Sequence, residues 1–194
     1  MIKMLTKHQR QRIISFAKKR AAQNDPFHRL PHLEEVARNA GFLAREEGAD
    51  PEICWAAAML HDICKSGRAD HGTAGAKEAS EFLAGIGLPE GLVDAVSDAI
   101  YFHNKPFRGG PIERRVLWDS DKLTIIGPSG FSRRLLPYWI MKQGEEEGTK
   151  TAAREYLFFE PLFRTKTGRK IAKRHSALMH RFLASLNGGV LPDA

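Results

Sequence analysis

The sequence predicts an all-α protein, and two observations lead to this prediction. Apolar residues recur at intervals of three and four along most of the chain, which is the spacing of one face of a helix. In no segment do apolar and polar residues alternate in the way that is typical of a half-buried strand. A chain of 194 residues, of which 42% are hydrophobic and 27% charged, can bury a core without disulfides. We therefore expect one helical domain over residues 1–194.

The chain begins with a basic segment that we expect to be the first helix. Residues 1–24 carry seven Lys or Arg and no acid, and residues 161–194 carry seven against one acid. The net charge of +7 is therefore the sum of two basic flanks around an acidic centre. A basic flank can attract nucleic acid, anionic lipid or a phosphorylated substrate, but it is more often the solvated face of a helix.

The first flank also resembles an organelle transit peptide, because it is rich in Arg and poor in acids. Its apolar residues nevertheless have helical spacing, and this favours a helix that packs on the core. The residues with this spacing are Ile2, Leu5, Ile13, Phe16 and Ala17.

Two helices are expected next. Apolar residues from Leu33 to Ala44 define one face of a helix that ends near Gly48. Pro51 then opens the segment EICWAAAMLHDICK, at a helical position where its missing N–H costs nothing. Because this segment is apolar almost all round, we expect it to form one buried central helix through Lys65.

Three more helices complete the central part. One covers about residues 72–86, and the next begins after Pro89 and keeps His103 on its apolar face. After a loop with two prolines and a Gly-Gly pair, a further helix covers about residues 112–126.

The C-terminal part is also expected to be helical. The Gly-Pro-Ser-Gly segment at 127–130 predicts a break, and helix follows to about Gln143. An acidic segment leads to another helix near 151–159, and a long basic helix covers about 167–186.

Several protein classes are not supported by the sequence. It has no run of the roughly 18 apolar residues that a membrane-spanning helix needs and no secretory signal, so we expect a cytoplasmic protein that does not bind membranes. The only cysteines, Cys54 and Cys64, are ten residues apart in what we expect to be one helix. They should therefore be two buried, inert thiols without a disulfide.

Histidines are concentrated in the central part of the chain. Five of the eight lie between residues 28 and 103, and one of them, His61, is followed directly by Asp62 in the most apolar expected helix. An acid in such a helix usually needs a partner or a metal. The remaining candidates lie near the ends of neighbouring expected helices, and facing helices of a bundle can bring such groups together. They are His32, His71, His103, Asp119 and Asp121.

Motifs that occur in order over about residues 28–126 resemble the HD superfamily of metal-dependent phosphohydrolases, which is named for an adjacent His-Asp pair. They are HLEEVARNA, AAAMLHDICK, HGTAGA, AIYFHN and WDSDKL, and the tail GRKIAKRHSALMHRFLASL resembles the last helix of small stand-alone bacterial HD hydrolases. The resemblance implies an all-α HD-domain helical bundle. Its five-helix metal-binding core would cover about 28–126, a C-terminal helical part about 127–190, and basic helices would form the two ends.

The resemblance implies that His32, His61, Asp62 and Asp121 bind one divalent metal. Two imidazoles and two carboxylates suit Mn, Fe, Co, Ni or Zn, and Mg is also compatible. Helical periodicity does not distinguish Asp119 from Asp121, because each is in phase with apolar neighbours. Family members have an acid followed by a basic or small residue and then an apolar one, and this favours Asp121, with Asp119 as an acceptor for a ligand imidazole.

Three further residues have catalytic roles in this interpretation. His71 and His103 match positions at which some HD subfamilies bind a second metal, although we expect one tightly bound metal and two histidines that orient water or phosphate and transfer protons. Lys65 matches a lysine that contacts phosphate, while it could simply be a solvated cation at a helix end. Lys105 and Arg108 are weaker candidates for anion binding. His28 is either a group that supports a ligand or a surface residue, and we favour the surface residue.

The function implied is hydrolysis of a phosphoester or phosphoanhydride in a nucleotide or another phosphorylated small molecule, through a metal-bound hydroxide. Alternatives are a dinucleoside polyphosphate hydrolase with a two-metal site, and a non-catalytic regulatory or nucleic-acid-binding module of the same fold. Nucleic acid is left open as a partner but not favoured, and a homodimer is left open. No Walker-type phosphate loop and no dinucleotide-binding glycine motif occurs in the sequence, so kinase and dehydrogenase functions are unsupported.

Overall fold

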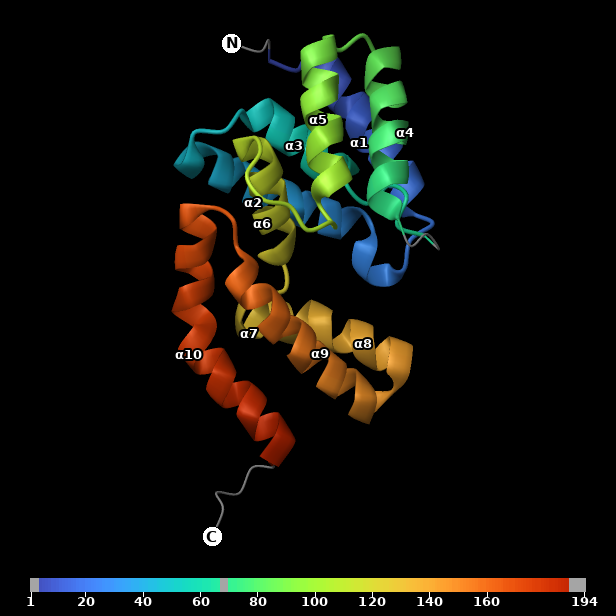
Figure 1. Cartoon of the computed structure of the whole chain (residues 1–194). Helices are drawn as coiled ribbons and strands as arrows, with labels where there is room; N and C mark the ends of the chain where they lie inside the picture. The colour runs from blue at the N-terminus through green and yellow to red at the C-terminus, as the bar shows by residue number, and fades with distance from the viewer. Residues whose placement is uncertain (1–3, 67–69, 189–194) are drawn as a thin grey trace. The chain divides into compact units, whose positions relative to one another are not determined.

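The computed structural model describes residues 4–66 and 70–188, and all secondary structure within these ranges is helical, which confirms the all-α prediction. The chain forms two compact units, residues 1–121 and 122–194, which we describe separately (Figure 1). The α-helices are α1 (Lys7–Ala21), α2 (Leu30–Glu47), α3 (Pro51–Leu60), α4 (His71–Gly85), α5 (Glu90–Phe102), α6 (Ile112–Lys122), α7 (Gly127–Gly130), α8 (Leu136–Gln143), α9 (Glu145–Phe159) and α10 (Lys166–Gly188). That both units form a single domain stays a prediction.

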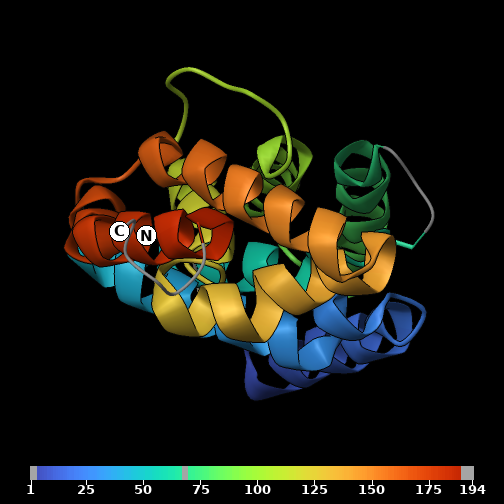
Figure 2. The same ribbon diagram turned by 90° about the horizontal axis from the view of Figure 1, so that it is seen from below.

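Helix α3 is the centre of the first unit. Asp50 caps its first turn by accepting hydrogen bonds from the N–H groups of Glu52 and Ile53, and Pro51 occupies the first helical position. Nearly every residue of α3 is buried, as its continuous apolar sequence predicts. It packs against α1, α2 and α5, while α4 and α5 lie side by side (Figures 1 and 2).

The basic N-terminal segment forms a helix that packs on this core. Ile13, Ala17 and Ala21 of α1 are fully buried, which confirms the expected packing, whereas Ile2 lies outside the described residues. Arg10 of α1 pairs with the buried carboxylate of Glu52 at 2.6 Å. The first flank is therefore anchored to α3 as well as solvated.

Three helix ends differ from the sequence-based expectation. α3 ends at Leu60, so His61 and Asp62 lie in the turn that follows it rather than inside a helix reaching Lys65. α6 ends at Lys122, before residue 126. α9 begins earlier than predicted, because the three glutamates at 145–147 form its first turn, where negative charge interacts favourably with the helix dipole.

The second unit has its own core. Phe131 and Tyr156 are fully buried in it, and their rings meet edge to face with centroids 6.1 Å apart. α8 and α9 lie side by side (Figure 2). Gly148 permits their close approach, because a Cβ atom there would lie 2.6 Å from the carbonyl oxygen of Trp139.

Two further expectations can be compared with the structure. Both cysteines are buried free thiols, and burial raises the pKa of Cys54, as expected of inert groups. They are not on one helix, however, because Cys64 lies beyond the end of α3. Among the described residues, no helix is long and apolar enough to cross a membrane.

Candidate metal centre

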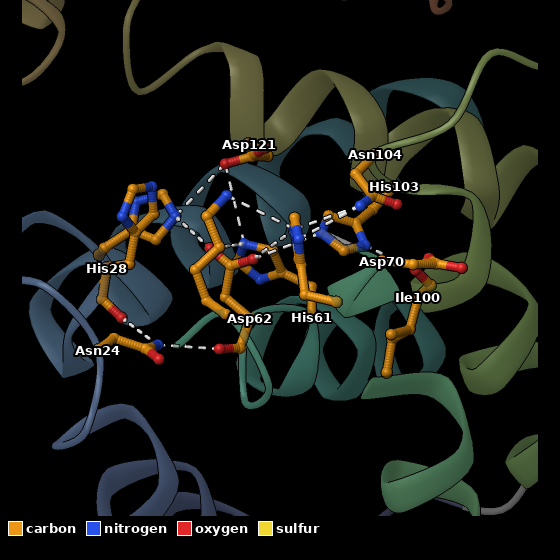
Figure 3. Close-up of polar contacts among 12 residues, drawn as sticks. Asn24, His28, His61, Asp62, Asp70, Ile100, His103, Asn104 and Asp121 are labelled. Atoms are coloured by element: carbon orange, nitrogen blue, oxygen red, sulfur yellow. Dashed lines mark hydrogen bonds and ion pairs between the residues drawn. The ribbon is translucent and has the colours of Figure 1, made fainter. Parts of the chain in front are cut away.

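The ends of five helices in the first unit bring the candidate residues together (Figure 3). His32 lies in the first turn of α2, and His61 and Asp62 follow α3 directly. The other three are His71 at the start of α4, His103 at the C-terminal cap of α5 and Asp121 near the end of α6. The four residues expected to bind a metal and the two histidines expected to be catalytic therefore lie in one cluster.

His61 and His103 are held in the same way. Each follows the last residue of its helix, and each Nδ1 donates to the carbonyl oxygen three residues earlier, at 2.8 Å for His61 and 2.6 Å for His103. Because a carbonyl oxygen only accepts, Nδ1 must carry the proton. The lone pair of the neutral ring is then on Nε2, which is directed toward Asp62 and is available to a metal.

A first group of ligand atoms consists of His32, His61 and Asp121. The Oδ1 atom of Asp121 lies 3.4 Å from Nε2 of His32 and 3.8 Å from Nε2 of His61. Asp62 faces the same group through Oδ2, which is 3.7 Å and 3.4 Å from these two nitrogens respectively.

A second group consists of Asp62, His71 and His103. The other oxygen of Asp62, Oδ1, lies 3.4 Å from Nε2 of each of these two histidines. The carboxylate of Asp62 therefore lies between two pairs of imidazoles and presents one oxygen to each pair.

The donor atoms fit divalent cations. His32 Nε2, His61 Nε2 and Asp62 Oδ1 are buried and have no hydrogen-bond partner within the part of the chain that the structure describes. Native proteins rarely leave such atoms unsatisfied, so a buried group of them needs an explanation. Imidazole nitrogens and carboxylate oxygens are ordinary ligands of Mn, Fe, Co, Ni and Zn.

The charges of the cluster are unusual for a protein interior. Burial would raise the pKa of Asp62, but the nearby positive charges of His61 and Lys65 hold it well below its usual value. Burial would lower the pKa of His61, but Asp62 outweighs this effect and raises it. Asp62 and His61 therefore each favour the charged form of the other.

His32 and His71 differ from His61 in this respect. Burial is the main cause of the lowered pKa of both histidines. Together with the repulsion from Lys65, burial lowers the pKa of His71 to about 3. The Nζ atom of Lys65 lies 3.5 Å from Nε2 of His71, so the lysine is at the cluster as expected. A neutral His71 is the form that binds a metal.

The structure places several residues about which the sequence left alternatives open. Among the described residues, the two groups include Asp121 and not Asp119, although Asp119 is fully buried nearby in α6. Lys105 pairs with Asp70 at 3.1 Å, which compensates part of its charge. The prediction that His28 is a surface residue is wrong. It is half-buried, pairs with Asp25 at 2.8 Å, and its ring centroid is 5.3 Å from that of His32.

Sequence reasoning missed three residues around the cluster. Asn24 donates to the carbonyl oxygen of Asp62, and Asn104 lies 3.3 Å from Nδ1 of His71. Gly72 leaves room for Asn104, because a Cβ atom at Gly72 would lie 2.3 Å from its Oδ1 atom. Contacts between residues more than thirty positions apart leave no periodic signal, although the Asn in AIYFHN directly follows a candidate histidine.

Comparison with known proteins gives the class that this fold and cluster define. The profile of the HD domain matches residues 29–126, about half of the chain. The chain therefore belongs to the HD superfamily of metal-dependent phosphohydrolases.

Individual relatives are similar along most of the chain. It is 30% identical over 144 residues to "Ribonuclease Y" of Alkaliphilus metalliredigens (strain QYMF), covering 73% of this chain but only 28% of that longer protein. A structure of a predicted HD superfamily hydrolase from an uncultured Thermotogales bacterium is 26% identical with a TM-score of 0.65, covering 93% of this chain and 92% of the other. Bacillus subtilis YpgQ in complex with ADP is 21% identical with a TM-score of 0.75, covering 94% and 95%, which shows a shared fold.

Proposed function

We propose that the cluster binds two divalent cations, one at His32, His61 and Asp121 and one at His71 and His103, with Asp62 shared between them. The single observation that supports this is the position of the Asp62 carboxylate, whose two oxygens each lie 3.4 Å from a histidine of a different group. The proposal departs from the single tightly bound metal that the sequence favours. The geometry supports two cations because the second group has a carboxylate oxygen of its own.

We further propose that the substrate is a nucleotide and that the bond hydrolysed is a phosphoester or phosphoanhydride. Divalent cations supply Lewis acidity and lower the pKa of bound water when they are present. The chain itself contributes fixed imidazoles with Nε2 facing the cluster, and a cation, Lys65, beside His71 that can contact phosphate oxygens. The ADP complex of the similar Bacillus subtilis protein supports a nucleotide substrate.

A second candidate function is hydrolysis of phosphodiester bonds in RNA. The 30% identity to Ribonuclease Y favours it, although this chain spans only 28% of that protein. The bond is again a phosphoester, so the same cluster would serve.

One experiment tests both candidates. Metal-free protein is supplied with Mn and incubated with nucleoside mono-, di- and triphosphates, a dinucleoside polyphosphate and a single-stranded RNA, and the products are separated by anion-exchange chromatography. We expect a nucleotide to be hydrolysed, and the Asp62→Ala protein to be inactive on it. Cleavage of RNA alone would favour the second candidate, while hydrolysis of none of them would contradict both.

A further inference from the structure

Asn24, which lies three residues after the end of α1, contacts the main chain of the residue that both groups of ligands share. Its side chain is only 3% exposed, and its Nδ2 atom donates two hydrogen bonds, each 2.9 Å long. The acceptors are the carbonyl oxygens of His28 and Asp62 (Figure 3). One amide therefore connects the segment before α2 to the turn that carries Asp62.

The orientation of this amide is determined by its partners. Both partners are carbonyl oxygens, which only accept hydrogen bonds, so the nitrogen and not the oxygen of the Asn24 amide must face them. The Oδ1 atom is then buried, and it has no hydrogen-bond partner among the described residues. An unsatisfied buried oxygen lowers stability. A contribution to stability alone therefore does not explain this asparagine well. Its two hydrogen bonds, to the carbonyl oxygens of His28 and Asp62, indicate a role in holding these two parts of the main chain in place.

Asn24 is attached to a rigid support. Its N–H group bonds to the carbonyl oxygen of Ala21, which is fully buried at the end of α1. One residue before Ala21, Arg20 pairs with Glu78 of α4 at 2.6 Å. The main chain of Asn24 is thus held by α1, independently of the hydrogen bond that its side chain makes to Asp62.

Asn39 makes an equivalent contact at the other carboxylate. It lies on α2, the helix that carries His32, and its Nδ2 atom donates to the carbonyl oxygen of Ser120 at 3.0 Å. Ser120 directly precedes Asp121 on α6. Each acid of the cluster thus has an asparagine that binds its own carbonyl oxygen or that of the residue before it.

We infer that Asn24 and Asn39 are positioning residues of the metal centre, which hold the main chain so that the carboxylates of Asp62 and Asp121 face the histidines. The inference depends on the proposed metal centre. Since neither amide touches the ligand atoms in any contact that the structure records, removing it should leave the ligands present but allow the main chain that carries them to shift. Groups that orient ligands in this way typically change metal affinity about 10- to 100-fold.

The test is a titration of metal-free protein with Mn, with free Mn measured by electron paramagnetic resonance and thermal unfolding of the metal-free protein recorded in parallel. We expect Asn24→Ala to bind Mn about 10- to 100-fold more weakly than the wild type, and Asn39→Ala about tenfold more weakly. The control is Leu83→Ala, which removes a fully buried side chain near the opposite end of α4 from His71. It should lower the unfolding temperature at least as much and leave Mn affinity within about threefold of the wild type.

The results of the Mn titration distinguish a failure of the positioning role from a failure of the proposed metal centre. Unchanged Mn affinity in Asn24→Ala would overturn the positioning role, because metal binding would then not depend on the amide. Equal weakening of Mn affinity in Leu83→Ala would also overturn it, because affinity would then simply follow the stability of the fold. If Asn24→Ala does not fold, Asn39→Ala decides, since Asn39 is only half-buried and its removal leaves no large cavity. Failure of the wild-type protein itself to bind Mn would instead contradict the proposed metal centre.

Discussion

At the scale of single residues, the order of motifs predicted the cluster, but it could not give the contacts within it. The sequence placed His32, His61, Asp62 and Asp121 together through the family resemblance, and the structure brings these four side chains into contact distance. Helical phase alone did not separate Asp119 from Asp121, because α6 is buried on more than one face. Asn24 could not be found, since its bond to Asp62 spans 38 positions.

The choice between the two acids of α6 gives the first prediction. Asp121→Asn should abolish hydrolysis and remove at least one equivalent of metal, because Asp121 Oδ1 lies 3.4 Å from His32. Asp119→Asn should lower activity by a smaller factor of about 10 to 100, as changes near but not in the ligand set tend to do. Elemental analysis of the two variants measures their metal content, and steady-state rates measure their activity. The opposite ranking would show that the acids are wrongly assigned.

The raised pKa of His61 predicts a pH dependence of metal binding. A histidine whose pKa lies above its usual 6.5 is largely protonated at pH 6, and a cation must displace that proton. Asp62 is already ionised and His71 already neutral over this range, so neither adds a proton. Mn affinity should therefore rise with pH, by up to about tenfold per unit below the pKa of His61.

Calorimetric titrations at pH 6, 7 and 8 test this dependence. Each is repeated in two buffers that differ in ionisation enthalpy, and the difference in heat gives the number of protons released. We expect protons to be released on Mn binding at pH 6, and the number released to fall as the pH rises through the pKa of His61. Equal affinity at all three values, without proton release, would contradict a protonated His61.

At the scale of helices, the sequence predicted the elements better than their ends. The apolar sequence continues past Leu60 to Ile63 and Cys64, so periodicity could not detect that α3 ends before His61. This early end has a functional consequence. It places His61 at a helix cap, where its Nδ1 can reach the Ala58 carbonyl and its Nε2 faces the cluster.

The contact between the start of α4 and the end of α5 gives a prediction at this scale. A Cβ atom at Gly72 would lie 2.3 Å from Oδ1 of Asn104 and 3.0 Å from the carbonyl oxygen of Tyr101, so Gly72→Ala must displace the Asn104 side chain and push against the main chain at the end of α5. His71 would then move away from His103, and we expect loss of one of the two proposed metal equivalents by elemental analysis.

The control for this change lies at the other end of the same helix. Gly85 has nothing within 4 Å of a Cβ atom, so Gly85→Ala should keep both metal equivalents. It should leave stability unchanged or raise it by up to about 1 kcal/mol, because Ala favours helix more than Gly does. Full metal content in Gly72→Ala would show that the spacing of these helix ends does not affect the centre.

At the scale of the whole molecule, the sequence correctly predicted a helical chain, and the structure adds a division into two compact units. The Gly-Pro-Ser-Gly segment at 127–130 suggested a break there, whereas the compact units divide between Asp121 and Lys122. Composition could not reveal this boundary, because α6 runs across it to Lys122. All residues of the two proposed ligand groups belong to the first unit, so the cations should stabilise the fold of that unit.

This stabilisation is the last prediction. A ligand that binds only the folded state adds about 2.7 kcal/mol per site at one hundred times its dissociation constant. For a chain of this size that corresponds to a rise of roughly 5–10 °C in Tm per site. Differential scanning calorimetry of metal-free protein with and without Mn should show this rise in Tm.

Asp62→Ala should show almost no rise in Tm and should retain almost no metal, since Asp62 faces both groups. Asp94→Ala, which removes an exposed carboxylate of α5, should behave as the wild type. An equal rise in Asp62→Ala would mean that Mn stabilises the protein from another site.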